Sequence, residues 1–134
     1  MTSAAGPDPC PCGSGDDYQA CCAVFHHGAD APTALQLMRS RYAAFVKRDA
    51  GYLARTSHPM LRAKLDSKGL RASFALAWSR LEILATRDGG ADDRQGMVHF
   101  RAIWRDAAGN EQVHEERSRF VRDGGAWVYR DAGG

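Results

Sequence analysis

Four cysteines lie between positions 10 and 22, and they are all the cysteines of the chain: Cys10, Cys12, Cys21 and Cys22. One residue separates the first pair and none separates the second. Thiolates in two such close pairs can reach the corners of a tetrahedron, with Zn–S bonds of about 2.3 Å. Gly13 and Gly15 let the chain turn sharply between the pairs, and they leave backbone N–H groups free to approach sulfur. The spacing therefore predicts one structural zinc ion.

Disulfides and free redox thiols are the competing interpretations. Disulfides need an oxidising compartment, and Met1–Pro7 has neither the basic start nor the apolar run of a secretory signal. No stretch is long enough and apolar enough to span a membrane. We therefore expect a cytoplasmic protein, where clustered cysteines bind metal or do redox work. A Cys-x-x-Cys redox pair is absent, and a bond between adjacent Cys21 and Cys22 would be strained.

His26 and His27 follow the last cysteine closely enough to compete for the metal. Either ring could replace one sulfur, so the fourth ligand is open between cysteine and histidine. Four thiolates already close a structural site, and a closed site has no position for a reactive water. The zinc is expected to hold shape, and to supply the folding free energy of a loop with almost no core.

Composition predicts one main domain behind this loop. Hydrophobic residues make up 44% of the chain and charged residues 25%, which is enough for a core. The formal charge is +2, and four thiolates with one Zn²⁺ would bring it to about zero. Without a strongly basic surface, we do not expect a nucleic-acid partner. Residues 1–9 carry prolines and small residues without an apolar period, and they are expected to be a disordered tail.

Helical patterns come first in the domain. After a connector at 28–32 that is expected to be flexible, Thr33 should cap a helix with an apolar face and a basic face. The apolar face holds Leu35, Met38, Tyr42, Phe45 and Val46, and the basic face holds Arg39, Arg41, Lys47 and Arg48. Asp49 should cap a short second helix that ends at His58-Pro59. Ser67 should start a third, with a buried stripe of Leu70, Phe74, Ala77 and Trp78.

From Leu81 onward the period changes to that of strands. Val98, Phe100, Ala102 and Trp104 alternate with polar or charged residues over a long strand. Turns at 107–110 and 123–125 bound a strand at 111–122 and a last strand around 127–129. Helices first and an antiparallel meander second predict an α+β fold, with helices on one face of the sheet.

The cysteine cluster resembles a known motif. Cys-Pro-Cys-Gly-Ser-Gly, followed by Tyr18 and the Cys-Cys pair, is similar to the SEC-C zinc motif, named for its place at the C-terminus of the SecA translocation ATPase. The resemblance implies that Cys10, Cys12, Cys21 and Cys22 are the ligands, within a motif at 10–27. This chain carries Asp16 and Asp17 where the motif usually carries lysines. That departure weakens the implication of an acidic partner.

A second resemblance covers nearly the whole chain. It rests on the strings at 38–45 and 114–120, on His58-Pro59 and on Trp127-Val128-Tyr129, all placed behind the SEC-C motif. Together they resemble the YchJ-like bacterial family. The resemblance implies a nuclear-transport-factor-2-like (cystatin-like) cone at 33–132, in which a curved antiparallel sheet wraps around helices and leaves a pocket. It implies no activity.

Polar residues in the late strands are the candidates for lining such a pocket. Glu115, Arg117 and Arg119 share one strand face, and His114, Glu116, Ser118 and Phe120 share the other. A paired Glu and Arg could orient a small polar or anionic ligand. His58 and His99 complete the candidate set, although charges on a half-covered sheet usually face water. Bulky Tyr42, Trp78, Phe100, Trp104 and Phe120 are expected in the core.

No catalytic constellation is recognisable in the sequence, although His58, His99, His114, Glu115 or Glu116 could serve as a base. The sequence therefore predicts a non-catalytic zinc-containing adaptor that binds a protein partner through the SEC-C motif. The alternative is a small-molecule enzyme of isomerase or hydrolase type that uses a polar pocket in the cone.

Overall fold

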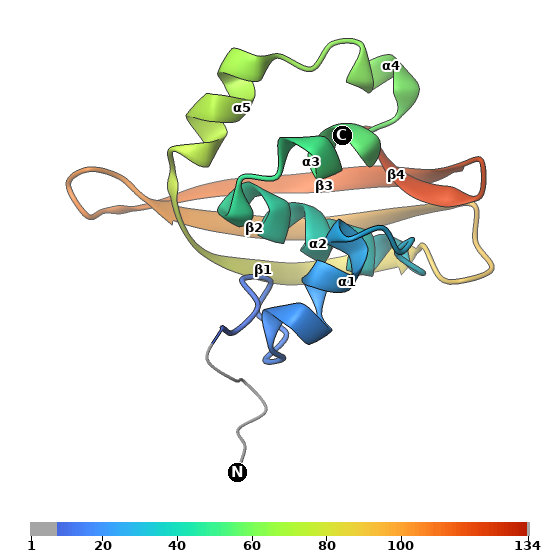
Figure 1. The fold of residues 1–134 in the computed structure, drawn as a ribbon, viewed down its shortest axis with the longest axis horizontal. Coiled ribbons are helices and arrows are strands. Elements are labelled where there is room, and N and C mark those ends of the chain that lie inside the picture. The colour runs from blue at the N-terminus through green and yellow to red at the C-terminus, as the bar shows by residue number, and fades with distance from the viewer. Residues whose placement is uncertain (1–7, 134) are drawn as a thin grey trace.

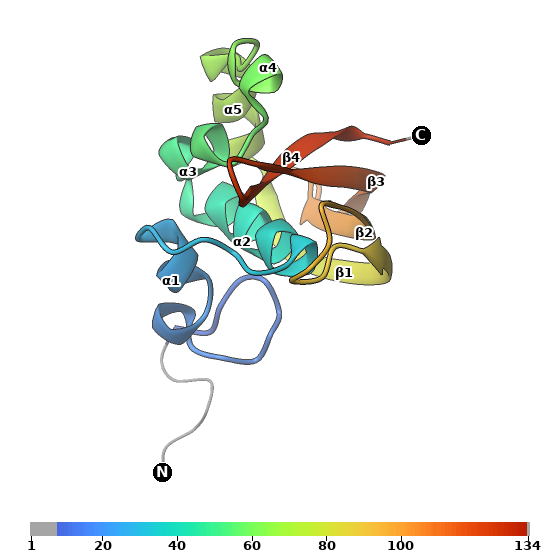
Figure 2. The ribbon, with the colours of Figure 1, turned by 90° about the vertical axis from the view of Figure 1, so that its right-hand side faces the viewer.

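Four antiparallel strands form one sheet, in the order β1-β2-β3-β4, in the computed structural model, which describes residues 8–133. The strands are β1 (Ala77–Asp88), β2 (Gln95–Arg105), β3 (Glu111–Asp123) and β4 (Ala126–Ala132). The helices lie on one side of the sheet (Figure 1), and a view along the strands leaves the opposite face open (Figure 2). Extra residues at two places in β1 and one in β4 interrupt the pairing, and such bulges bend a sheet. The predicted α+β fold is confirmed.

Three of the helices, α2, α3 and α5, begin where the sequence predicts. They are η1 (Tyr18–Ala20), α1 (Cys22–His26), α2 (Ala34–Lys47), α3 (Ala50–Arg55), α4 (Pro59–Arg62) and α5 (Ser67–Phe74). The Thr33 hydroxyl accepts from the Gln36 N–H at 3.1 Å, and the Asp49 carboxylate accepts from the Tyr52 N–H at 3.0 Å. Each bond satisfies an N–H that the first helical turn would leave free.

The main core lies between α2 and the inner face of the sheet, the face toward the helices. Leu37, Met38 and Tyr42 of α2 pack with buried side chains of the strands, which are Val98, Phe100, Ala102, Phe120 and Trp127. The segment after α3 runs along the edge strand β4, where the Tyr129 N–H donates to the Thr56 carbonyl at 2.8 Å and the His58 N–H donates to the Tyr129 carbonyl at 2.9 Å. These bonds occupy backbone groups of the edge strand that would otherwise be free to pair.

Two boundaries differ from the sequence expectation. The third predicted helix ends at Phe74, and Ala77 and Trp78 belong to β1, which begins four residues before the expected Leu81. Trp78 is half-buried against the main core, as the predicted helix also required, so its expected burial did not distinguish helix from strand. The second predicted helix, α3, ends at Arg55, before His58-Pro59, and Pro59 instead starts α4, because the fixed φ of proline suits the first helical position.

Two segments expected to be loose are attached. Residues 1–7 of the expected tail lie outside the described residues, but the Asp8 carbonyl accepts from the Tyr18 N–H at 2.8 Å, and Pro9 pairs with Asp17. In the connector at 28–32, Ala31 is buried in the core and the Pro32 carbonyl accepts from the indole N–H of Trp127 at 3.2 Å. The connector is therefore part of the packed domain.

Candidate functional site

The four cysteine sulfurs lie together at one end of the molecule. All are within 4.8 Å of one another, and the Sγ atoms of Cys12 and Cys21 are 3.7 Å apart. A regular tetrahedron with Zn–S bonds of about 2.3 Å has edges of about 3.8 Å. Cys10, Cys12 and Cys22 are buried, whereas Cys21 is half-buried. The residues present therefore fit a single tetrahedral metal ion.

Hydrogen bonds among the thiols distribute the protons of the cluster unequally. The pKa of Cys22 is raised, first by its hydrogen bonds with Cys10 and Cys12, in which it keeps its proton, and then by burial. The pKa of Cys12 is lowered because Cys10 and Cys22 donate to its sulfur. The hydrogen bond to Cys12 raises the pKa of Cys10 to about 11. A bound divalent cation would displace the remaining protons, because metals bind the thiolate form.

The chain between the cysteine pairs, at residues 12–21, owes its shape to turns. Gly13 and Gly15 have φ of 82° and 90°, a left-handed conformation that strains other residues. The Ser14 hydroxyl lies 3.2 Å from the sulfur of Cys21, and the Asp17 carboxylate caps η1 by accepting from the Gln19 N–H at 3.1 Å. The two glycines therefore make the predicted sharp turns, although the Gly13 N–H donates to the Cys10 carbonyl at 3.2 Å and not to a sulfur, and Asp17 acts as a cap.

Residues 8–22, the cysteine loop, dock on α2. Ala43 of α2 is fully buried in the same apolar cluster as the cysteines and Tyr18. The Arg39 guanidinium donates to the Cys12 carbonyl at 2.8 Å, and the Lys47 ammonium lies 4.2 Å from the centroid of the Tyr18 ring. The predicted basic face of α2 thus supports the loop.

His26 joins the loop to the domain through both ring nitrogens. Its Nε2 donates to the Ser40 carbonyl at 2.8 Å, and its Nδ1 accepts from the Tyr18 hydroxyl. The ring also packs edge-on against Tyr52, with centroids 4.6 Å apart. Burial lowers the pKa of His26, so the neutral ring is favoured. Among the described residues the metal-ligating cluster contains neither His26 nor the exposed His27.

Replacing His26 with glutamine should make stability less dependent on pH. The folded ring is neutral because its pKa lies below the ordinary 6.5, so unfolding takes up a proton in mild acid. The stability from this ring is present above the unfolded pKa and is lost as pH falls toward the lowered pKa, by up to about 1.4 kcal/mol per pH unit. Thermal unfolding of zinc-saturated protein between about pH 7.5 and about pH 5.5 measures this loss. The control His27→Gln should keep the wild-type slope, and equal slopes for all three proteins would refute the assignment.

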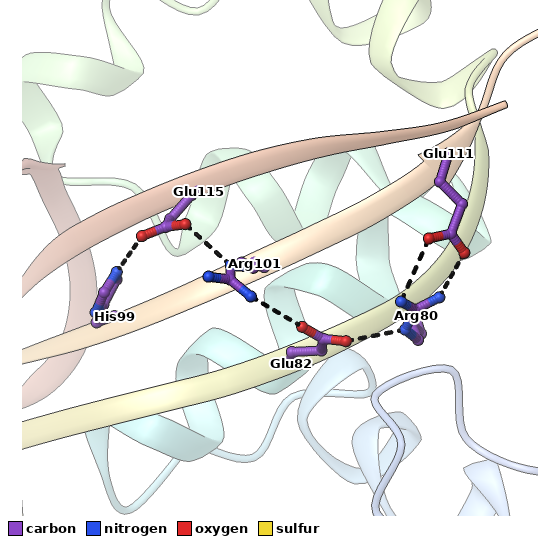
Figure 3. A network of polar contacts seen from close by, with 6 residues as sticks. All are labelled: Arg80, Glu82, His99, Arg101, Glu111 and Glu115. Carbon is purple, nitrogen blue, oxygen red and sulfur yellow. Dashed lines mark hydrogen bonds and ion pairs between the residues drawn. The ribbon is translucent and has the colours of Figure 1, made fainter.

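His99 and Glu115, two of the predicted pocket residues, belong to an ion-pair network on the outer face of the sheet, the face away from the helices. Its members are Arg80, Glu82, His99, Arg101, Glu111 and Glu115 (Figure 3). The Glu115 carboxylate accepts from Arg101 Nε at 3.0 Å and from His99 Nε2 at 2.7 Å. These hydrogen bonds, that from Arg101 first, lower the pKa of Glu115. Exposed pairs of this kind stabilise little, because water screens them.

The other three predicted pocket residues, Arg117, Arg119 and His58, do not meet in the inner cavity. Arg117 lies on the outer face with His99 and Glu115, at an open hollow of about 270 Å³, and its side chain forms no hydrogen bond or ion pair within residues 8–133. Arg119 is engaged by Asp131 at two points, 2.6 and 2.7 Å. His58 caps α4 by accepting from the Met60 N–H at 3.2 Å. Glu115, Arg117 and Arg119 therefore lie at open hollows of the outer face and do not line the inner cavity of the cone.

The inner face bears the cone cavity, of about 360 Å³, between α2, α5 and the strands. Its polar centre is Glu116, whose carboxylate accepts from Ser118 at 2.6 Å, from Tyr129 at 2.8 Å and from His114 at 3.0 Å. Burial alone would raise the pKa of Glu116, but these three hydrogen bonds outweigh it and the pKa is lowered. Aromatic side chains line the cavity, among them Tyr42, Phe45, Trp78, Phe100 and Trp104.

Two signals for this cavity were present in the sequence. Glu116, Ser118 and Phe120 are two residues apart along the strand and so share one face. Phe120 is bulky and apolar and must face the core, so Glu116 and Ser118 lie on the inner face as well. Arg41 was assigned to the basic face of its helix, yet it follows Met38 by three residues and so shares the apolar side. It lines the cavity.

A SEC-C motif in front of a nuclear-transport-factor-2-like domain is the class that this fold and cysteine loop define. The family model described as the middle NTF2-like domain of YchJ matches residues 33–132, and the SEC-C motif model matches residues 7–23. The chain belongs to the YchJ-like family.

Relatives and solved structures agree with this assignment. A UPF0225 protein of Streptomyces avermitilis is 52% identical over 132 residues, which cover 97% of this chain and 87% of the relative. A UPF0225 protein of Streptomyces coelicolor is 53% identical over 126 residues, or 92% and 93% of the two chains. The solution structure of a SEC-C motif-containing protein from Rhodopseudomonas palustris is similar, with a TM-score of 0.81 and 35% identity over 91% of this chain and 94% of that one. In the described part of this chain, no helix has the length and apolarity needed to cross a membrane.

Proposed function

We propose that this protein is a non-catalytic adaptor of the cytoplasm, in which one zinc ion held by Cys10, Cys12, Cys21 and Cys22 shapes a loop that recruits a protein partner. One observation chiefly supports the proposal: the four sulfurs fit around a single ion. Four thiolates leave such an ion no open position for water or substrate, so its role is to hold shape. Neither a nucleic acid nor insertion into a membrane is part of the proposal.

The position of the loop also supports this role. Gly13, Ser14, Gly15 and Asp16 are exposed at its tip, whereas its base is fixed to α2. A rigid, exposed tip loses little conformational entropy when it binds. Asp16 gives the tip a negative charge, which favours a basic or neutral partner surface over an acidic one.

A photocrosslinking residue at position 16 tests the adaptor role in cells that express the protein. Ala108, exposed in the turn between β2 and β3, is the matched control position. We expect a protein that crosslinks from position 16, does not crosslink from position 108, and is lost when Cys22→Ser removes the metal. Asp16→Lys should slow association and alter its salt dependence, while Asp17 is left intact because it caps η1. Identical crosslinked proteins from both positions, with or without metal, would rule the adaptor out.

A specific observation favours small-molecule chemistry as a second candidate function. His114 donates to Glu116 at 3.0 Å within the inner cavity, and Tyr129 donates to the same carboxylate. A histidine held by a carboxylate beside a cavity is an arrangement that can move a proton to or from a bound molecule. An isomerase or hydrolase of this kind would use His114 as its base, in place of the outer-face His99.

A further inference from the structure

We propose that the inner cavity binds a small monocarboxylate with a flat apolar body, and that Arg41 is its anion-binding group. This binding is independent of the adaptor role, and it holds whether or not His114 acts on the bound molecule. The proposal rests on the bonding of Arg41, on the state of Glu116 and on the walls of the cavity.

Arg41 is fixed on one side of its guanidinium and unpaired on the other. Its Nη1 donates to the Thr56 hydroxyl at 2.7 Å and to the Leu53 carbonyl at 3.1 Å, which are neutral oxygens. No carboxylate of residues 8–133 lies within 4.0 Å of its nitrogens. Burial lowers the pKa of Arg41 to about 10, which reflects the cost of placing a cation among protein atoms without a counter-ion at ion-pair distance, and the charge of Glu116 offsets only part of this cost. A ligand carboxylate would supply that counter-ion.

The free edge of this guanidinium is open to a ligand. Nε and Nη2 of Arg41 form no hydrogen bond within the described residues. Every fully buried side-chain nitrogen in these residues has a hydrogen-bond partner, so Nε and Nη2 must both be accessible from outside the packed interior. Because Arg41 lines the cavity, these donors are available from it. Adjacent N–H groups of a guanidinium form a fork that matches the two oxygens of a carboxylate.

Glu116 does not take the place of that ligand. Its carboxylate accepts three hydrogen bonds, from Ser118, Tyr129 and His114, and it lies beyond ion-pair distance from Arg41. Its bond to the Tyr129 hydroxyl holds the Tyr129 ring against Arg41, whose central carbon is 4.9 Å from the ring centroid. Glu116 is thus a positioning residue. Its nearby negative charge also disfavours a dianion such as phosphate, so a monoanion is the better fit.

The remaining walls select an apolar body. The aromatic rings of Tyr42, Phe45, Trp78, Phe100 and Trp104 enclose most of the space, and a volume of about 360 Å³ is in the range of small-molecule sites. A purely apolar molecule would fill the space between these walls but would leave the donors of Arg41 without an acceptor. A cation would meet the guanidinium and be repelled.

Naphthoate and its uncharged isostere naphthamide test the proposal, with binding followed by NMR spectra of the backbone amides. We expect naphthoate to bind the intact protein about tenfold more tightly than naphthamide, with shifts at β2, β3 and α2. Arg41→Gln should remove this preference. Ser73→Phe narrows the cavity and leaves Arg41 intact, so it should weaken the binding of both molecules. It locates the binding in the cavity even if Arg41→Gln does not fold. Arg117→Gln on the outer face should bind as wild type.

Several outcomes would overturn the assignment. They are equal affinity for the acid and the amide, an unchanged preference in folded Arg41→Gln, and shifts confined to the outer face that disappear in Arg117→Gln. Failure of naphthoate and the smaller benzoate to bind at millimolar concentration would also overturn it.

Discussion

Replacing Cys22 with serine is expected to remove the metal and to destabilise the whole domain by several kcal/mol. Cys22 is 1% exposed and is one of the four sulfurs that lie within 4.8 Å of one another. Structural zinc contributes about 10–16 kcal/mol of apparent binding free energy in finger peptides, comparable to the entire stability of a domain. Metal analysis after native purification, together with thermal unfolding, measures both effects. Ser14→Ala is the matched control, because Ser14 contacts a sulfur but is not a ligand.

The same substitution should disturb α2 as well as the cysteine loop. The flexible connector expected from the sequence would have let the loop melt alone, but Arg39 and Ala43 of α2 are bonded to it or packed against it. We therefore expect amide signals around these two residues to shift when a chelator removes the metal. A domain whose spectrum and melting temperature are unchanged without metal would show that loop and domain are independent.

Gly96→Ala should be strongly destabilising, by about 2–4 kcal/mol. A Cβ at Gly96 would lie 2.5 Å from the Cα of Gly89 and 3.2 Å from the Cβ of Ala34. The backbone cannot yield here, because Gly89 accepts from the first N–H of α2, at Ala34, at 2.9 Å. Relief of this contact would therefore separate α2 from the β1–β2 hairpin. Chemical denaturation of the variant and wild type gives the difference.

Gly51→Ala is the control for the glycine prediction. Gly51 lies in α3, and a Cβ there would meet nothing closer than the Asp49 side chain, at 3.7 Å. Alanine favours a helix over glycine, so this variant should gain up to about 1 kcal/mol. If both variants changed stability equally, the close approach of Gly96 to Gly89 would be wrong.

The sequence predicted those features that depend on neighbouring residues. Thr33 and Asp49 marked helix starts through their caps, and Gly13 and Gly15 marked the turns of the cysteine loop. The sheet followed from the alternation of Val98, Phe100 and Ala102, which is a local period too.

Features that depend on tertiary packing were harder to predict. Both faces of β3 carry charged residues, so charge alone does not show which face is the inner one or whether Glu115 or Glu116 lines the cavity. The position of Phe120 in the core shows that Glu116 is on the inner face. The role of His26 depends on Ser40, fourteen residues away, and no local pattern connects them. The sequence predicts Arg41 on the basic face of its helix, because a buried arginine without a carboxylate partner is rare in a core.

X-ray absorption at the zinc edge, on protein purified without added metal, shows directly which atoms surround the ion. A central zinc ion held by Cys10, Cys12, Cys21 and Cys22 predicts one equivalent of zinc with four sulfur neighbours at about 2.3 Å and no lighter ones. A nitrogen neighbour would place His26 or His27 on the metal. An oxygen neighbour would mean an open site, and either result, or protein without metal, would contradict a closed four-thiolate centre.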